Sequence, residues 1–289
     1  MNDNSFDYLA FQGALKGRFD ELHAEVENLA IEYQHARPFP FILIDDFLPG
    51  TIAEATAADI PDKNSRDWKK LPTEDQKGKY VLADESKLPV IIRAVIQELN
   101  SGYFLRFLEK LTGIPDLISD TKLVGGGVHM IERGGKLSVH VDFSHHPTNG
   151  LNRRLNFLLY LNKNWKEEYG GHFELWSSDI KTREQKILPI FNRCVVFSTS
   201  PISYHGHPEP LNCPEGMTRN SIALYYFSKG QTKEDEGVHN TLFKSRPEDR
   251  FQLGNFVVRV ASSGLVREIL PPVVYTLVRK LWNRKYTGA

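Results

Sequence analysis

The sequence predicts an α+β protein in which helices come first and a mainly β, antiparallel core follows. Up to about residue 120, apolar residues recur at helical spacing. Beyond that point, short apolar or alternating segments are separated by Gly, Pro, Asn and Asp. Many short strands at regular spacing are typical of a β-sandwich or a jelly-roll barrel.

The composition excludes several classes of protein. Thirty-six Lys and Arg balance 36 Asp and Glu among 289 residues, and 40% of the residues are hydrophobic. A disordered chain has fewer apolar residues and more net charge, and a generally basic nucleic-acid binder has a positive surplus. No stretch reaches the roughly 18 apolar residues of a transmembrane helix. The polar N-terminus and the two cysteines, Cys194 and Cys213, lead us to expect a cytoplasmic protein with reduced thiols.

The first part of the chain contains two helical patterns, a strand and a polar segment. One helix face is formed by Phe19, Leu22, Val26, Leu29 and Tyr33, and Pro38 and Pro40 end that helix. Residues 41–44 predict a short buried strand. The polar residues 62–84 predict a long exposed loop, with Trp68 and Tyr80 as candidates for a lid. A second helical pattern runs from Leu88 to Leu111.

The predicted β core occupies about residues 121–228. Its strands are expected at Gly127–Ile131, Leu137–Phe143, Leu155–Leu161, His172–Trp176, Ile187–Ile190, Cys194–Ser198 and Ser221–Phe227. The Gly125–Gly127 run lacks the Lys-Ser/Thr of a phosphate-binding loop, so it predicts a bulge or a close approach of strands.

We divide the chain into an N-terminal helix (1–37), a domain that holds the β core (38–230) and a C-terminal extension (231–289). The extension ends in an amphipathic helix with Val273, Leu277 and Leu281 on one side and basic residues near the other. Contact with an anionic membrane surface is one interpretation of this pattern. An ordinary packed helix is the favoured one, since amphipathicity is the norm for surface helices.

Histidine–acid pairs are frequent in this chain. His23, His140, His172 and His207 each precede a carboxylate by two positions. Residues i and i+2 share one face of a strand but diverge by about 200° on a helix, which rejects His23. His207 precedes a proline, in a segment without a regular strand. His140-x-Asp142 and His172-x-Glu174 both remain possible ligand pairs, and a solvated outer face is the alternative for each.

The residues that follow favour the pair at His140. Two histidines and one carboxylate form the facial triad that binds Fe(II), and His205 can supply the second imidazole. His207 faces the same way and is its rival. Farther on, Arg219 and Ser221 share a strand face and can hold a carboxylate, although Arg219 alone would suggest a surface cation.

The order His140-x-Asp142, His205, Arg219-x-Ser221 resembles the signature of the 2-oxoglutarate- and Fe(II)-dependent dioxygenases. The prolyl 4-hydroxylase-like branch fits best. It is similar at Tyr160–Trp165, at Gly170-Gly171 before a strand, and at the opening segment 38–48. The resemblance runs from about residue 38 to 228.

This resemblance implies a double-stranded β-helix, which is a cupin-like jelly roll, with N-terminal helices packed on it and a C-terminal helical extension. It makes His140, Asp142 and His205 the iron ligands. Arg219 and Tyr160 would bind the distal carboxylate of 2-oxoglutarate, with Ser221 as a weaker helper. The chain departs from the family at Met130, where prolyl hydroxylases that act on proteins can carry a tyrosine.

The implied activity is hydroxylation of an unactivated C–H bond, with O₂, coupled to decarboxylation of 2-oxoglutarate to succinate. L-ascorbate would support it, and the carboxylate of Asp142 favours hydroxylation over halogenation. The expected substrate is peptidyl proline or a small metabolite or biosynthetic precursor, and no nucleic-acid partner is expected. Two alternatives remain: a cupin-like metalloenzyme that does not use 2-oxoglutarate, and a non-catalytic jelly-roll binding module.

Overall fold

The computed structural model describes residues 7–229 and 237–249 of the chain. The chain divides into two units, residues 1–244 and 245–289, and the fold given below is that of the first. The predicted C-terminal amphipathic helix lies outside the described residues. None of the described helices is long and apolar enough to cross a membrane. Cys194 and Cys213 are buried free thiols, as expected.

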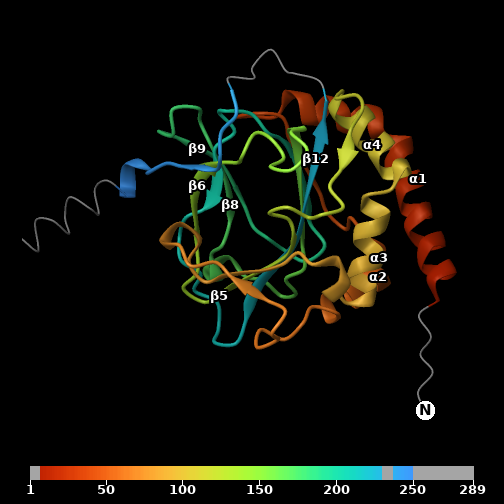
Figure 1. Cartoon of the computed structure of the whole chain (residues 1–289), viewed down its shortest axis with the longest axis horizontal. Helices are drawn as coiled ribbons and strands as arrows, with labels where there is room; N and C mark the ends of the chain where they lie inside the picture. The colour runs from red at the N-terminus through yellow and green to blue at the C-terminus, as the bar shows by residue number, and fades with distance from the viewer. Residues whose placement is uncertain (1–6, 230–236, 250–289) are drawn as a thin grey trace, which may run out of the picture. The chain divides into compact units, whose positions relative to one another are not determined.

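The described residues of this unit form two antiparallel sheets and four α-helices (Figure 1). The helices are α1 (Tyr8–His35), α2 (Gly50–Ala58), α3 (Val90–Leu99) and α4 (Gly102–Thr112). The large sheet has the order β1 (Phe41–Ile44), β10 (Cys194–Ser198), β7 (Asn152–Tyr160), β12 (Thr218–Ser228), β5 (Gly127–Glu132), β3 (Lys79–Leu82), β2 (Lys69–Lys70), and β4 (Ile118–Ser119) also pairs with β12. The small sheet has the order β13 (Leu242–Phe243), β6 (Leu137–Val141), β11 (His205–His207), β8 (Phe173–Trp176), β9 (Arg183–Ile187). The predicted fold class, a mainly β jelly roll with helices packed on it, is confirmed.

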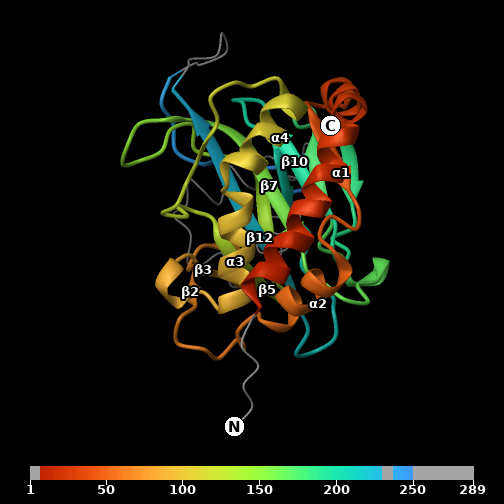
Figure 2. The ribbon, with the colours of Figure 1, turned by 90° about the vertical axis from the view of Figure 1, so that its right-hand side faces the viewer.

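The large sheet lies between the helices and the small sheet. Side chains alternate along each of its strands, so one face of the sheet packs against the helices and the other faces the small sheet. On β7, Leu155, Phe157 and Leu159 join the main hydrophobic core with α1, α3 and α4. Figure 2 shows these helices across the outer face of the sheet. The intervening Leu158 and Tyr160 face the other way and pack with residues of the small sheet. The inner face of the large sheet is therefore free to line a site.

One of the two helix predictions needs correction. The pattern from Leu88 to Leu111 forms two helices, since the chain breaks at Asn100 and Ser101. The hydroxyl of Ser101 accepts a hydrogen bond from the backbone N–H of Phe104, at 3.3 Å, and so caps the start of α4. The first helix, Tyr8–His35, lies within the predicted segment 1–37, and Phe11 and Leu15 extend its buried face.

The prediction of one exposed loop over residues 62–84 was wrong. The segment contains β2 and β3, and β3 pairs with β5 to extend the large sheet. The sequence pattern does not indicate β3, because Lys79 occupies a buried position in the strand where an apolar residue is usual. Trp68 donates from its indole to the carbonyl of Asp62, and the hydroxyl of Tyr80 donates to Glu132.

The glycine run before the β core allows the strands to approach closely, as expected. Gly127 has φ +94°, and a Cβ there would lie 2.3 Å from the carbonyl oxygen of Leu82. A Cβ on Gly126 would lie 2.7 Å from the carbonyl oxygen of Ala223. Any side chain would therefore push β5 away from its neighbours, and with it the wall of the site.

Candidate metal and co-substrate site

A cavity of about 390 Å³ lies between the two sheets. Strands of the small sheet supply histidines to it, and strands of the large sheet supply cations, hydroxyls and apolar side chains. All six residues predicted for the site line this one cavity: His140, Asp142, Tyr160, His205, Arg219 and Ser221.

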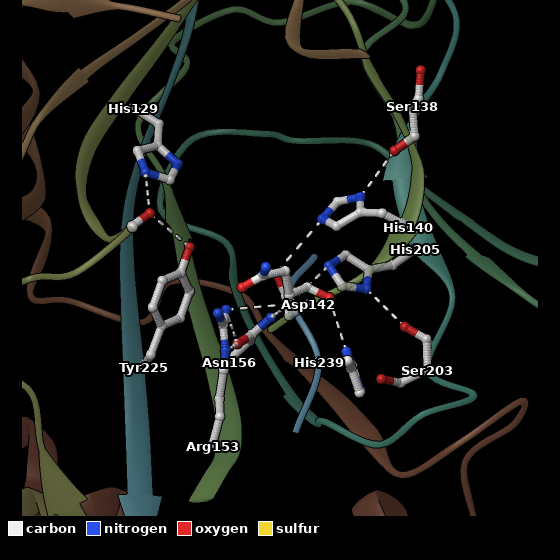
Figure 3. Close-up of polar contacts among 12 residues, drawn as sticks. His129, Ser138, His140, Asp142, Arg153, Asn156, Ser203, His205, Tyr225 and His239 are labelled. Atoms are coloured by element: carbon white, nitrogen blue, oxygen red, sulfur yellow. Dashed lines mark hydrogen bonds and ion pairs between the residues drawn. The ribbon is translucent and has the colours of Figure 1, made fainter. Parts of the chain in front are cut away.

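The pairing of β6 with β11 places His140 directly opposite His205. Their rings lie 4.4 Å apart between centroids, and both Nε2 atoms face Asp142, which follows the end of β6 (Figure 3). The His140 Nε2 atom lies 3.6 Å from Asp142 Oδ1, and the His205 Nε2 atom lies 3.3 Å from Asp142 Oδ2. Within residues 7–229 and 237–249, no other group of three His, Cys, Asp or Glu residues brings its ligand atoms together in this way.

Backbone carbonyls fix the protonation of both rings. The Nδ1 of His140 lies 2.9 Å from the carbonyl oxygen of Ser138, and the Nδ1 of His205 lies 2.8 Å from that of Ser203. A carbonyl oxygen only accepts, so each Nδ1 carries the proton and each Nε2 keeps its lone pair. Burial, helped by the neighbouring His205, lowers the pKa of His140, which keeps that ring neutral.

Asp142 is held by two residues of β7 that the sequence analysis missed. The amide of Asn156 donates to Asp142 Oδ2 at 2.6 Å, and Arg153 Nη2 lies 3.2 Å from the same oxygen. Arg153 also donates to the amide oxygen of Asn156 from Nε and Nη2, at 3.0 and 2.6 Å. Burial alone would raise the pKa of Asp142, but Arg153 and the two histidines outweigh it and hold the pKa well below its usual range. The carboxylate is therefore ionised.

Arg153 is clamped between two aromatic rings. Its Cζ lies 3.4 Å from the ring centroid of Tyr225 and 4.4 Å from that of Phe143. Guanidinium groups stack well on aromatic faces, so this clamp fixes the side chain that orients Asp142. The signal in the sequence was that β7 carries two arginines and two asparagines although most of its residues are buried.

A second polar arrangement surrounds Arg219. Its Nε donates to the carbonyl of Gly171 at 2.8 Å, and its Nη2 donates to the Tyr160 hydroxyl at 3.4 Å. Both side chains are buried, which lowers the pKa of Arg219 and raises that of Tyr160. Ser221 lies directly opposite Tyr160 in the sheet. A buried guanidinium beside two hydroxyls is suited to a carboxylate.

Two further histidines and a lysine also line the cavity. The strand pairings place Val81, His129, Ser221 and Tyr160 in one row across the sheet, and Lys79, Ile131 and Arg219 in the next. Met130 points out of the cavity, between His129 and Ile131, which line it. His207 is buried, and neither of its ring nitrogens has a hydrogen-bond partner among the described residues.

The rival pair at His172 is engaged elsewhere. The Nε2 of His172 lies 2.9 Å from a carboxylate oxygen of Glu167. Glu174 accepts hydrogen bonds from Arg183 at 3.0 Å and from the indole of Trp176 at 3.1 Å. These two residues therefore do not join the His140 cluster.

The donor set of the cluster fits a metal ion of a particular kind. Two neutral imidazole lone pairs and one ionised carboxylate converge on one point, and ligands about 2.1 Å from a metal lie roughly 3 Å from one another. Two histidines and one carboxylate that leave open positions suit ferrous iron. Fold and site together define a facial-triad metalloprotein built on a jelly roll.

Comparisons with known proteins agree with this class. Residues 126–227 match the 2OG-Fe(II) oxygenase superfamily. The chain is 28% identical over 197 residues to the mouse (Mus musculus) prolyl 3-hydroxylase OGFOD1, which covers 67% of this chain and 32% of that protein. It thus spans about a third of the length of this curated relative. The chain is therefore similar to the 2OG-Fe(II) oxygenase superfamily over its β core, and to a prolyl hydroxylase over a longer stretch.

Solved structures share the fold. A prolyl hydroxylase from Trichoplax adhaerens, in complex with a peptide of hypoxia inducible factor, matches with a TM-score of 0.51 at 18% identity, over 74% of this chain and 92% of that one. A prolyl 4-hydroxylase from Phytophthora capsici matches with a TM-score of 0.50 at 19% identity, over 84% of this chain and 75% of that one.

Proposed function

We propose that the protein is a non-haem Fe(II)- and 2-oxoglutarate-dependent hydroxylase. One observation carries the proposal: the cluster of His140, Asp142 and His205 and the buried pair of Arg219 and Tyr160 line the same cavity. A five-carbon keto diacid needs two such subsites, a metal for its keto acid end and a cation for its far carboxylate.

The residues of the cavity have separate roles in this reaction. His140, Asp142 and His205 hold the iron, and the carbonyls of Ser138 and Ser203 orient the two imidazoles. Arg219 binds the distal carboxylate of 2-oxoglutarate through its guanidinium, with the hydroxyls of Tyr160 and Ser221 as additional donors.

Apolar side chains complete the site. The ring of Phe197 lies 4.7 Å from that of His205 and the ring of Phe173 lies 5.6 Å from it, between centroids, so both exclude water on that side. When bound, Fe(II) and 2-oxoglutarate supply the oxidation, in which decarboxylation to succinate and CO₂ is coupled to insertion of one oxygen atom of O₂ into a C–H bond.

Anaerobic spectroscopy tests the proposal directly. Fe(II) and 2-oxoglutarate together should give a metal-to-ligand charge-transfer band with the wild-type protein and none with His140→Ala or Asp142→Ala. The His172→Ala variant is a matched control, since this histidine also precedes a carboxylate by two positions but lies outside the cluster. A wild-type protein without the band would not be a 2-oxoglutarate-dependent oxygenase, which would leave the binding module and the cupin-like metalloenzyme as alternatives.

Turnover assays distinguish a 2-oxoglutarate-dependent hydroxylase from a cupin-like metalloenzyme that does not use 2-oxoglutarate. In a 2-oxoglutarate-dependent hydroxylase, Arg219→Ala should lose substrate-dependent release of succinate because the co-substrate is no longer anchored. In a cupin-like metalloenzyme that does not use 2-oxoglutarate, the same variant should keep its metal-dependent turnover.

Peptidyl proline is one candidate substrate, supported by the similarity to the mouse prolyl 3-hydroxylase. A small metabolite or a biosynthetic precursor is the other. Succinate release screened against proline-containing peptides and a metabolite panel distinguishes them. We propose further that the enzyme acts in the cytoplasm and that L-ascorbate sustains turnover, which a titration of ascorbate into the assay tests.

A further inference from the structure

Lys79 is a buried lysine in the wall of the site cavity. It comes from β3, the strand that replaces the expected loop, and only 8% of the residue is exposed. Its ammonium forms no hydrogen bond or ion pair with any residue in the described part of the chain. Burial lowers the pKa of Lys79 to about 8, and the Asp142 carboxylate is the group that most opposes this shift. A buried ammonium without a partner is costly, which points to a role in binding.

Lys79 and Arg219 come from the two strands on either side of β5. Both lie opposite Ile131, one on each side of β5, so their Cα atoms are two strand spacings apart, about 10 Å. Arg219 is already oriented by Gly171 and Tyr160. One carboxylate held by Arg219 therefore leaves Lys79 available for another group.

The charge balance of the cavity requires a further anion. Four cations line it, namely Lys69, Lys79, Arg153 and Arg219, and Asp142 is the only acid among its described residues. In the proposed complex, Asp142 and one carboxylate of 2-oxoglutarate neutralise the iron, and the other carboxylate neutralises Arg219. Arg153 then shares Asp142 with the iron, and Lys79 has no counter-charge of its own among the described residues.

Arg153 adds a second unused donor. Its Nη1 is buried and has no hydrogen-bond partner among the described residues, although Nε and Nη2 are engaged. Arg219 and Arg153 both lie close enough to lower the pKa of Lys79. The cavity thus holds one buried arginine nitrogen without a hydrogen-bond partner and the ammonium of Lys79.

We propose that Lys79 binds an anionic group of the primary substrate, so that the substrate of this enzyme is a carboxylate or a phosphate and not a neutral prolyl peptide. This inference rests on the proposed function and specifies its substrate class. The anion is held on the Asp142 side of the cavity, with Arg153 Nη1 as a second donor. The hydroxylated carbon then lies near that anionic group.

Small probes test the anion site without knowledge of the substrate. The protein is loaded with Mn(II) and saturating 2-oxoglutarate, and binding of propionate, phosphate and the neutral isostere propionamide is followed by the paramagnetic relaxation of probe nuclei. We expect at least one anion to bind saturably and at least tenfold more tightly than propionamide. Propionate and phosphate compared with each other show which anion the site favours.

Three variants make the assignment specific. Lys79→Met should weaken binding of the preferred anion at least tenfold, Lys79→Arg should largely retain it, and Lys69→Met should stay within about threefold of wild type. Lys69 is the matched control, since it lines the same cavity but is exposed. Arg153 is unsuitable as a test because it also holds Asp142.

Three results would overturn the inference. The wild-type protein could bind propionamide as tightly as the anions, or it could bind neither anion saturably. The third result is that Lys79→Met binds the preferred anion as tightly as wild type does. A tenfold rise in the Kd of 2-oxoglutarate in Lys79→Met would assign Lys79 to the co-substrate instead. If wild type fails to bind 2-oxoglutarate, the proposed function is wrong, and the anion titration on the Mn(II) protein alone still decides whether Lys79 forms an anion site.

Discussion

Arg219 donates a hydrogen bond from Nε to the backbone carbonyl of Gly171, at 2.8 Å. Gly171 has φ +69°, and a Cβ there would lie 2.5 Å from Leu211 Cδ2 and 3.0 Å from Arg219 Cδ. The absence of a side chain at position 171 thus makes room for the arginine. This relationship links the glycine pair, which the sequence alone explains as a turn, to the arginine that we propose binds 2-oxoglutarate.

The Gly171→Ala variant should therefore bind 2-oxoglutarate poorly. The new methyl group displaces the guanidinium from Tyr160, and we expect the KM for 2-oxoglutarate to rise at least tenfold while the affinity for metal is unchanged. Gly216→Ala is the matched control, because Gly216 also has a positive φ but nothing lies within 4 Å of its Cβ position. Both variants should lose about 1 kcal/mol of stability from backbone strain. Equal KM values in the two variants would refute the steric link.

Arg153 should control metal affinity without contacting the metal. Removal of a residue that orients a metal ligand typically weakens metal binding by about 10- to 100-fold. We expect a loss of this size in Arg153→Met, measured by Mn(II) titration followed by electron paramagnetic resonance. Arg154→Met is the control, because this neighbouring arginine donates to Ser228 and not to Asp142. A normal metal affinity in Arg153→Met would show that Asn156 alone suffices to position Asp142.

Replacement of His205 by alanine should reduce metal affinity far more than replacement of His207. His205 lies opposite His140 and faces Asp142, whereas His207 lies opposite Leu137, beyond a bulge in β11. We expect His205→Ala to lose stoichiometric binding of Mn(II) and His207→Ala to keep its affinity within about tenfold. The reverse result would make His207 the ligand. Circular dichroism of both variants checks that each is folded.

Lys79→Met should stabilise the metal-free protein. The folded pKa of Lys79 is about 8, below its usual 10.5, so the charged form is penalised in the folded state. The penalty is fully present below pH 8. Between pH 8 and pH 10.5 the unfolded chain binds more protons than the folded protein, so the penalty disappears as the pH rises through this range. At about 1.36 kcal/mol per pKa unit, a shift from 10.5 to about 8 makes the variant more stable at pH 7 by on the order of 3 kcal/mol.

Urea unfolding at pH 7 and near pH 10 measures this difference. The stability advantage of Lys79→Met over wild type should shrink near pH 10, because Lys79 of the folded wild-type protein is then largely neutral. A variant that is less stable than wild type at pH 7 would show that Lys79 has a structural role. The expected combination, greater stability with weaker anion binding, is typical of a residue kept for function.

The local pattern of the sequence was sufficient for the fold class and for the candidate residues. Alternation along a strand puts residues i and i+2 on one face, which left His140/Asp142 and His172/Glu174 as candidate pairs and put Arg219 and Ser221 on one face. The order of these motifs along the chain added the resemblance to a family. The same local reasoning failed at residues 62–84, because a buried lysine at position 79 hides the strand.

Only the tertiary structure decided which distant residues meet. The register of β6 against β11 puts His205 and not His207 opposite His140, and nothing local to either histidine specifies that register. The support of Asp142 by Arg153 and Asn156, the space that Gly171 leaves for Arg219, and the entry of Lys79 into the cavity all depend on pairings between separate strands. Side-chain direction follows from backbone geometry within a strand, whereas these contacts depend on how the whole chain packs.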